Sequence, residues 1–333
     1  MVEQDAARPS PRRVILDCDP GIDDALAILL ALRSPEIRLE TITTVAGNVP
    51  LERTAENALK LTELAGRPDV PVAAGAAAPL EKKLEVADFV HGSDGLGGLE
   101  LPPPKRALDP RAAWEVLAQT VLGDPEPVTV VAVGPLTNIA LALEAAPDLA
   151  WQVEELIVMG GAECSGNATP AAEYNVYADP DAAQKVLGSG AQITLLTLEA
   201  TRQAPLRREH LEALRIAQSP VARAAAYLGA RYLDFAASHG ADAAALHDPL
   251  AVGLAIDRSF AKRTVSARVE VETRGEFTYG ATVIDRRLAA RPLIDAGEYL
   301  RRGEPEPVAP NVRLPVEIDG DRFAAFLVNR LAR

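Results

Sequence analysis

Four aspartates fall within eight residues near the start of the chain, between two apolar segments. Residues 14–16 (Val-Ile-Leu) have the composition of a short buried strand, and residues 25–32 (ALAILLAL) have that of an apolar helix. The residues between them, 17–24, are Asp-Cys-Asp-Pro-Gly-Ile-Asp-Asp. The pattern predicts that four carboxylates are gathered at one strand-to-helix turn.

Carboxylates so close together repel one another, and a fold keeps them there only if a positive charge offsets the repulsion. A divalent cation would do so, and carboxylate oxygens favour hard ions such as Ca2+ or Mg2+ over zinc. The alternative is helix capping, with Asp19 as the cap and with Asp23 and Asp24 at the positive end of the helix. Capping explains one or two acids but not four with a Pro-Gly turn between the pairs. Metal binding is therefore the better interpretation.

The composition limits the class of protein. The chain has 333 residues, 48% of them hydrophobic, and a net charge of -13. This charge argues against nucleic acid or an anionic membrane as the main partner, because either favours a basic surface. Two cysteines indicate no disulfide framework. The first 13 residues resemble no secretory or twin-arginine signal, and no apolar run approaches the roughly 18 residues that span a membrane. We expect a cytoplasmic protein.

Strand-like and helix-like segments alternate through the first two thirds of the chain. This alternation predicts an α/β fold with a single open, mostly parallel, Rossmann-like sheet flanked by helices. The expected strands are 37–45, 128–133, 156–159 and 193–198, and the expected helices are 51–64, 136–145, 179–187 and 322–331. We expect a helical insertion over 205–239 and a small late β element from 265–273 and 279–284. No linker divides the chain, so we predict one domain over 1–333, with residues 1–12 disordered.

The turns that follow the strands carry the polar residues. In a parallel sheet with right-handed crossovers these turns lie at one edge, and ligands bind at that edge. The turns after Leu16, Val45, Val133 and Met159 should therefore converge, although they are far apart in the sequence.

Six motifs in these turns carry a family likeness. They are residues 17–24, Thr43–Asn48, Val133–Asn138, Met159–Gly161, Gly166-Asn167 with residues 172–175, and His247-Asp248-Pro249. With these motifs in this order, the chain resembles the inosine-uridine-type nucleoside hydrolases, which cleave the N-glycosidic bond of ribonucleosides.

The resemblance implies a calcium site and a ribose site. Ca2+ would be held by Asp19, Asp24, Asp248 and the main-chain carbonyl of Val133, with Asp17 supporting the loop by hydrogen bonds. The residues implied to bind the substrate are Asp23, Asn48, His91, Met159, Asn167, Glu173, Tyr174, Asn175 and His247. An extended segment would point Glu173 and Asn175 at one ligand. Alternatively, Asn48 and Asn167 are ordinary turn residues and Glu173 is an exposed acid.

The resemblance also implies the catalytic roles. Asp19 would take a proton from the attacking water, and His247 would activate the leaving base. The alternative for the motif at residues 247–249 is a helix start with Asp248 as N-cap and Pro249 at N1, which leaves His247 without a role. His91 opens a glycine-rich stretch that suits a mobile lid or a plain surface loop. Which aromatic residue lines the base pocket, among Tyr227, Tyr232 and Phe235, stays open.

Two other functions agree with part of the sequence. A haloacid-dehalogenase-type phosphatase also begins with a strand and Asp-x-Asp, as in Asp17 and Asp19, but it needs a later lysine and a second acidic pair, whereas only Asp248 follows here. A non-catalytic, Ca2+-dependent nucleoside or pentose binder would be favoured by replacement of Asp19 or His247, and both are present. The base preference is open, with a broad or inosine-uridine-like pattern expected. Similar proteins form homo-oligomers, so a dimer or tetramer is expected.

Overall fold

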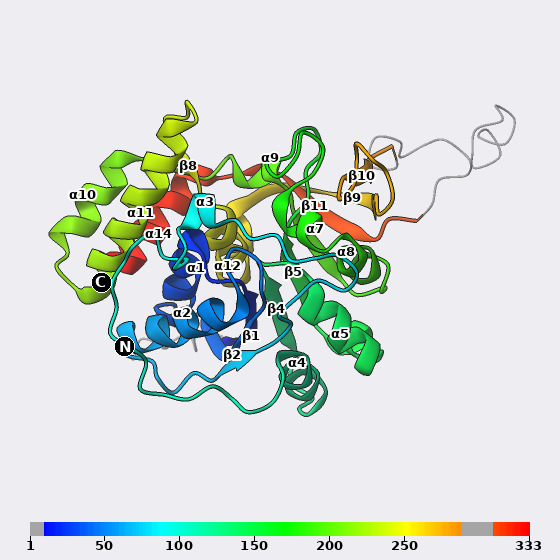
Figure 1. Ribbon diagram of the computed structural model, residues 1–333, viewed down its shortest axis with the longest axis horizontal. Helices are drawn as coiled ribbons and strands as arrows, with labels where there is room; N and C mark the ends of the chain where they lie inside the picture. Colours follow the sequence, from blue (N-terminus) through cyan, green and yellow to red (C-terminus); the bar gives the residue numbers. More distant parts are fainter. Residues whose placement is uncertain (1–9, 288–308) are drawn as a thin grey trace, which may run out of the picture.

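The computed structural model describes residues 10–287 and 309–333. Within these residues the main sheet has nine strands in the order β10-β9-β11-β6-β5-β4-β1-β2-β3 (Figure 1). Six strands pair in parallel: β1 (Arg12–Cys18), β2 (Ile37–Thr44), β3 (Val72–Ala74), β4 (Val128–Ala132), β5 (Glu155–Met159) and β6 (Ile193–Leu196). The sheet continues through β11 (Val312–Ile318), β9 (Ala261–Val271) and β10 (Thr282–Asp285), of which β9 is antiparallel to both neighbours. The predicted mostly parallel α/β sheet is confirmed.

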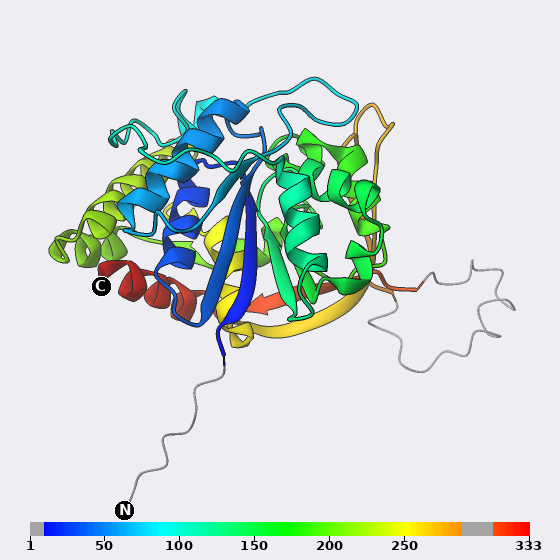
Figure 2. The same cartoon turned by 90° about the horizontal axis from the view of Figure 1, so that it is seen from below.

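Helices cover both faces of the sheet (Figure 2). One face packs against α1 (Ile22–Leu32), α2 (Leu51–Leu64), α11 (Pro220–Ser238), α12 (His247–Ile256) and α14 (Gly320–Ala332). The other packs against α4 (Ala113–Leu122), α5 (Thr137–Ala145), α6 (Leu149–Gln152) and α8 (Pro180–Leu187). Strand β1 separates the two cores, because Val14 and Leu16 face one and Ile15 faces the other. Every residue of α1 is buried, which explains why this helix has no polar stripe.

The strand order changes direction between β1 and β4. From β1 the chain continues outward through β2 and β3, and it then returns to add β4, β5 and β6 on the other side of β1. The segments that leave β1 and β4 therefore run to opposite faces of the sheet and open a crevice between them, where open α/β sheets bind ligands. Residues 19–24 follow β1, and Val133 follows β4. The expected convergence of the strand ends is confirmed.

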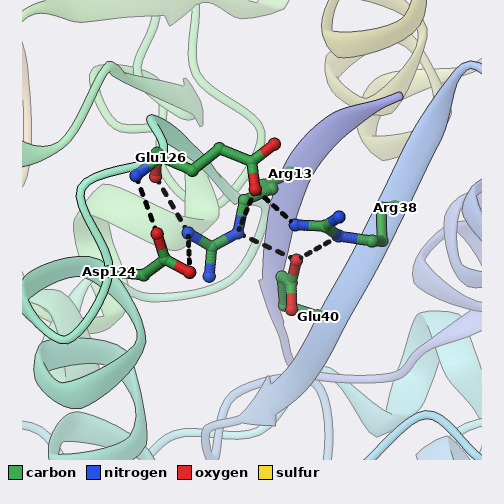
Figure 3. A network of polar contacts seen from close by, with 5 residues as sticks. All are labelled: Arg13, Arg38, Glu40, Asp124 and Glu126. Carbon is green, nitrogen blue, oxygen red and sulfur yellow. Dashed lines mark hydrogen bonds and ion pairs between the residues drawn. The ribbon is translucent and has the colours of Figure 1, made fainter. Parts of the chain in front are cut away.

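A polar network joins the other ends of these strands (Figure 3). Arg13, only 6% exposed, pairs with Glu40 of β2 at 2.9 Å and donates to the carbonyl of Glu126, just before β4, at 2.9 Å. Arg38 bridges the carboxylates of Glu40 and Glu126, at 2.7 Å each. Asp124 approaches Arg13 at 3.6 Å. The network joins β1 to β2 and to the segment before β4 at the amino edge of the sheet. It therefore helps to fix the relative positions of the strands whose other ends form the crevice.

Three predicted segments differ from the structure. The insertion is not one helix: β7 (Pro205–Leu206), which pairs with β8 (Ala244–Ala245), is followed by α10 (Arg208–Ile216) and α11. The two helices are separated because Ser219 caps α11 and Pro220 starts it. The strand predicted over 193–198 ends at Leu196. Residues 1–9 lie outside the described residues, but Arg12, predicted to be disordered, begins β1.

The late β element and the closing helix are confirmed. Strands β9 and β10 pair antiparallel around the turn that contains Arg274-Gly275-Glu276, and α14 closes the chain. The remaining helical turns are α3 (Asp88–His91), α7 (Tyr174–Ala178), α9 (Leu198–Thr201) and η1 (Arg258–Phe260). Among the described residues, none of the helices has the length and apolar character needed to cross a bilayer.

Candidate active site

A cavity of about 230 Å³ lies at the carboxyl edge of the sheet. Most of the residues singled out in the sequence line it, namely Asp23, Asn48, His91, Val133, Met159, Asn167, Glu173, Tyr174, Asn175, His247 and Asp248. Two of the three aromatic candidates on α11, Tyr232 and Phe235, also line it. The lining is completed by four residues that the sequence did not single out: Ala87, Phe89, Val90 and Ala168. Asp17, Asp19 and Asp24 are fully buried and do not line it. Eight separate stretches of chain thus meet around one space.

Three carboxylates gather at this cavity. Ligand oxygens of Asp23, Asp24 and Asp248 all lie within 4.8 Å of one another. Asp24 is held in place because its Oδ2 accepts from the amide of Gly21, the N-cap of α1, at 2.9 Å, and its Oδ1 accepts from the amide of Asp19 at 3.1 Å. Asp24, and not Asp19, therefore serves the helix start. Helix capping therefore accounts for Asp24 alone, and it does not explain why Asp23 and Asp248 lie next to it.

Asp19 lies in a pocket formed by backbone. Its Oδ2 accepts from the amide of Asn48 at 2.7 Å, while its buried Oδ1 has no hydrogen-bond partner among the described residues. A Cβ on Gly47 would come within 2.1 Å of Oδ2, and a Cβ on Gly134 within 2.6 Å of Oδ1. Only glycine at these two positions leaves room for the carboxylate. A buried carboxylate oxygen without a hydrogen-bond partner is costly, and binding of a cation would satisfy it.

The electrostatics of the cluster favour a bound cation. Burial, reinforced by the charge of Asp23, raises the pKa of Asp24 to about 7. Burial and the neighbouring acids also raise the pKa of Asp19 and Asp248 well above the usual range. The charged forms are therefore costly unless a positive charge is bound. With the carbonyl oxygen of Val133 nearby, the donors are all oxygen and fit a hard divalent ion.

The Val133 carbonyl is already engaged on one side. The Nδ2 of Asn175 donates to it at 2.7 Å and also donates to the carbonyl of Met159 at 3.2 Å. A carbonyl oxygen has two lone pairs, so this bond leaves Val133 one for another partner. Asn175 thereby holds together the ends of β4 and β5 at the cavity.

Asp17 lies outside the cavity and is held by side chains from two other elements. Its Oδ1 accepts from the hydroxyl of Thr43 at 2.5 Å and from the Nδ2 of Asn138 at 2.8 Å. Burial raises the pKa of Asp17 to about 7, against the opposing effect of these two hydrogen bonds. The arrangement links strands β1 and β2 to helix α5, and Asp17 contributes no atom to the lining.

Glu173 and Asn175 reach the cavity by a route that differs from the prediction. The expected extended segment is wrong, because Glu173 is the N-cap of α7 and Asn175 lies in its first turn. The Glu173 carboxylate accepts from the amides of Asn175, Val176 and Gly161 at 2.9–3.1 Å. Glu173 is only 2% exposed, so the alternative of an exposed acid is also wrong. Burial raises its pKa to about 7.

Asn48 and Asn167 are more than turn residues. Asn48 is buried and donates from Nδ2 to the Oδ2 of Asp24 at 2.9 Å. Asn167 accepts from the amide of Tyr174 at 2.8 Å through Oδ1, and the Tyr174 hydroxyl in turn donates to the carbonyl of Glu85 at 2.9 Å. These bonds fix the loop around Asn167 against the segment that leads to His91.

Two histidines line the cavity, and the Nδ1 of each has a partner. The amide of Ile22 donates to the Nδ1 of His91 at 3.0 Å, so the proton of the neutral His91 ring is on Nε2. The Nδ1 of His247 lies 2.6 Å from the Oγ1 of Thr201. Burial lowers the pKa of both rings and favours their neutral forms. Helix α12 begins at His247 with Leu246 as N-cap, so the alternative of Asp248 as N-cap and Pro249 at N1 is wrong.

The structure also separates the three aromatic candidates on α11. Tyr232 and Phe235 line the cavity, and the hydroxyl of Tyr232 donates to Oδ2 of Asp23 at 3.3 Å. Tyr227 instead lies 39% exposed and donates to the carbonyl of Gly97. Thr201, which holds His247, was missed in the sequence, although its place just after a buried strand was a usable signal.

Comparison with known proteins places this cavity in a family. The family model for the inosine-uridine preferring nucleoside hydrolases matches residues 14–325. The chain belongs to this family. It is therefore a nucleoside hydrolase, an enzyme of the N-glycosidase class that acts on ribonucleosides.

Individual relatives match over almost the whole chain. The pyrimidine-specific ribonucleoside hydrolase RihA of Citrobacter koseri is 40% identical over 321 residues, which cover 96% of this chain and 97% of that protein. Among solved structures, the plant nucleoside hydrolase PpNRh1 superimposes with a TM-score of 0.88 at 36% identity, covering 97% of this chain and 99% of its own. The purine-preferring ribonucleoside hydrolase of Gardnerella vaginalis gives 0.86 at 31% identity, covering 96% and 98%. This hydrolase shares its fold with enzymes of both base preferences.

Proposed function

We propose that this nucleoside hydrolase is Ca2+-dependent and cleaves ribonucleosides to free base and ribose at the cavity described above. The observation that carries the proposal is the meeting of one buried acidic cluster with neutral histidines around a single space of about 230 Å³. Carboxylates suit a cation and a sugar with adjacent hydroxyls, while neutral histidines suit the departing base.

Asp19, Asp24, Asp248 and the Val133 carbonyl are proposed to hold the ion. When bound, Ca2+ supplies a positive charge that orients the ribose 2- and 3-hydroxyls and lowers the pKa of a water beside them. The set of closest carboxylates includes Asp23 and not Asp19. We assign Asp23 to the ribose because Tyr232 already holds one of its oxygens, and Asp19 to the ion because its Oδ1 has no hydrogen-bond partner in the part of the chain that the structure describes.

The remaining lining residues are proposed to hold the ribose. Asn48, Asn167, Glu173 and Asn175 each retain polar atoms that can bond to sugar hydroxyls while their other atoms bond to protein. Held at several points, the ring is positioned for reaction, and binding energy is used for orientation. Met159 and Tyr174 supply contact surface at the edge of the sugar.

Cleavage then follows from the positions of three side chains. Asp19 accepts a proton from the attacking water, while the carboxylates below the ring favour the positive charge that develops at C1. His247 and His91, both neutral, can donate hydrogen bonds to the departing base on the opposite side. Tyr232 and Phe235 offer aromatic surface next to the base.

We further propose that pyrimidine ribonucleosides are the preferred substrates. Support comes from the 40% identity to the pyrimidine-specific RihA, against 31% to the purine-preferring enzyme. The broad or inosine-uridine-like pattern expected from the sequence is the second candidate, supported by the family description. A cytoplasmic location and a dimeric or tetrameric state stay predictions.

The decisive experiment measures ribose release from uridine, cytidine, inosine and adenosine, each with and without a calcium chelator. We expect release that the chelator abolishes and added Ca2+ restores, with uridine and cytidine fastest. Asp19→Asn should lose activity, whereas Asp148→Asn on the surface should not. Nucleoside binding without release would favour the non-catalytic binder. Release that resists the chelator would refute the calcium requirement.

A further inference from the structure

Thr201 lies behind His247 and has no other evident reason to be polar. It ends α9, the single helical turn that follows β6 at the carboxyl edge of the sheet, and its side chain is fully buried. Its Oγ1 is 2.6 Å from the Nδ1 of His247, and it approaches the carbonyls of Thr197 and Leu198 at 3.3 Å each. A buried hydroxyl in contact with a cavity histidine fixes where the ring proton resides.

The distances favour donation by the hydroxyl. Its 2.6 Å contact with the Nδ1 of His247 is much shorter than its two contacts with the carbonyls, so the hydroxyl proton gains most by pointing at the ring nitrogen. The two carbonyls at 3.3 Å lie beyond the usual range for an O–H donor, about 2.5–3.0 Å. Both carbonyls also accept backbone amides, from Thr201 and Arg202. The hydroxyl proton is therefore directed to His247, whose Nδ1 accepts it.

We propose that Thr201 is a positioning residue that keeps the ring proton of neutral His247 on Nε2, the nitrogen left to meet the nucleobase. The proposal rests on the proposed function of the cavity. With the opposite tautomer, Nε2 would present a lone pair to a base that gains negative charge as the bond breaks. Thr201 thus turns a histidine that could accept or donate into one that donates.

The proton balance is simple. The C1–N bond breaks with its electron pair on the base, and the Nε2–H of His247 stabilises the resulting anion by a hydrogen bond. The oxygen of water bonds to C1, and its proton goes to Asp19. The base then takes up one proton from solvent, equal to the one that Asp19 later releases. His247 remains neutral throughout, so Thr201 keeps the same bond before and after cleavage.

Kinetics with two leaving groups test the proposal. Uracil leaves as a poor anion that needs the hydrogen bond, whereas the nitrophenolate of p-nitrophenyl riboside is stable without it. We expect Thr201→Val to lower kcat for uridine by about 10- to 100-fold, within the range of a lost proton-donating group. Its KM for uridine and its activity on the nitrophenyl riboside should stay within about 3-fold, because ribose and Ca2+ contacts are unchanged.

Two control variants separate positioning from packing. Thr201→Ser keeps the hydroxyl and should retain wild-type selectivity between the two substrates. Thr62→Val removes another buried threonine hydroxyl bonded within a helix, at 2.8 Å to Leu59, far from the cavity, and should change neither activity. Equal losses of Thr201→Val on both substrates, or no loss on uridine, would overturn the proposal.

The tautomer can also be measured without any reaction. Long-range 1H–15N spectra distinguish a protonated ring nitrogen from an unprotonated one, and the His247 signals are those missing in His247→Gln. We expect a protonated Nε2 and an unprotonated Nδ1 in the wild type, and a mixture in Thr201→Val. A wild-type ring protonated on Nδ1 would refute the inference. Absence of turnover on both substrates with the expected tautomer would instead refute the proposed function.

Discussion

Replacement of Asp24 by asparagine should stabilise the metal-free protein near pH 8 and remove its stabilisation by Ca2+. Asp24 accepts three hydrogen bonds, from the amides of Asp19 and Gly21 and from the Nδ2 of Asn48. Asparagine has one acceptor oxygen, which can serve Gly21 and Asn48, so its amide group would face the Asp19 amide. The variant loses one bond, at about 2 kcal/mol for an unsatisfied buried donor.

The lost hydrogen bond is opposed by a gain, because the variant no longer keeps an ionised carboxylate buried. The pKa of Asp24 is raised from 3.8 to about 7, chiefly by burial. At 1.36 kcal/mol per pKa unit, holding the ionised group in the fold costs about 4 kcal/mol relative to the unfolded chain. The charge of Asp23, whose carboxylate lies within 4.8 Å of that of Asp24, adds to the effect of burial. The expected net gain at pH 8 is about 2 kcal/mol.

The gain should depend on pH with a defined sign. Because the pKa of Asp24 is higher in the folded state, the folded chain binds more protons than the unfolded chain between about pH 4 and pH 7. The wild type therefore loses stability as pH rises through this range, and this group adds no further change above it. At pH 5 the cost of Asp24 falls to about 1.6 kcal/mol. The advantage of the variant should have disappeared there.

Chemical unfolding of both proteins in chelator, from pH 5 to pH 8, measures these differences, and Ca2+ titration followed by thermal unfolding measures the metal response. The surface variant Asp148→Asn serves as a control for the loss of one negative charge. If Asp24→Asn is no more stable than the wild type at pH 8, burial does not impose the cost argued above. If Ca2+ raises the Tm of both equally, Asp24 does not bind the ion.

Three further substitutions test other contacts. Gly47→Ala places a Cβ within 2.1 Å of the Asp19 carboxylate, so kcat/KM and Ca2+ affinity should each fall at least about 100-fold, as measured by ribose release and calorimetry. Arg13→Met removes a buried charge from its partners and should lower the free energy of unfolding by about 2 kcal/mol in urea titrations, whereas Arg38→Met, at a half-exposed site, should lower it by less. Tyr232→Phe removes a hydrogen bond to a buried acid and should raise KM for uridine about 5-fold, with little change in Tm.

The location of the cavity was predictable because the signals that define it are local. A buried strand is recognisable from a short apolar run, and the residues just after it must lie at the carboxyl edge when strands are parallel. This reasoning alone brings residues 17–24, Asn48 and Val133 to one edge, and among them Asp23, Asn48 and Val133 line the cavity. The roles assigned to these residues stay predictions, since they came from the family resemblance.

The choice among the aromatic residues was not predictable, because it depends on how a helix docks. Tyr227 and Tyr232 are five residues apart on α11, so at 100° per residue their side chains diverge by about 140°. Which of them faces the cavity is set by the packing of α11 against α1 and by the break at Ser219, neither of which a hydrophobic pattern specifies. The extended form assumed for Glu173 failed for a related reason, since the carboxylate itself caps the helix that begins beside it.

Thr201 was overlooked because of an error of two residues at one strand end. The apolar run from Ile193 continues through Leu195, Leu196 and Leu198, and a period of two does not separate a strand from a following helical turn over so few residues. The strand in fact ends at Leu196, and Thr197 begins the turn. With the strand extended to Leu198, the helical turn Leu198–Thr201 is not foreseen, and this turn is what brings Thr201 to His247. In a parallel α/β fold, strand ends therefore matter more than strand centres for finding the residues that surround a ligand.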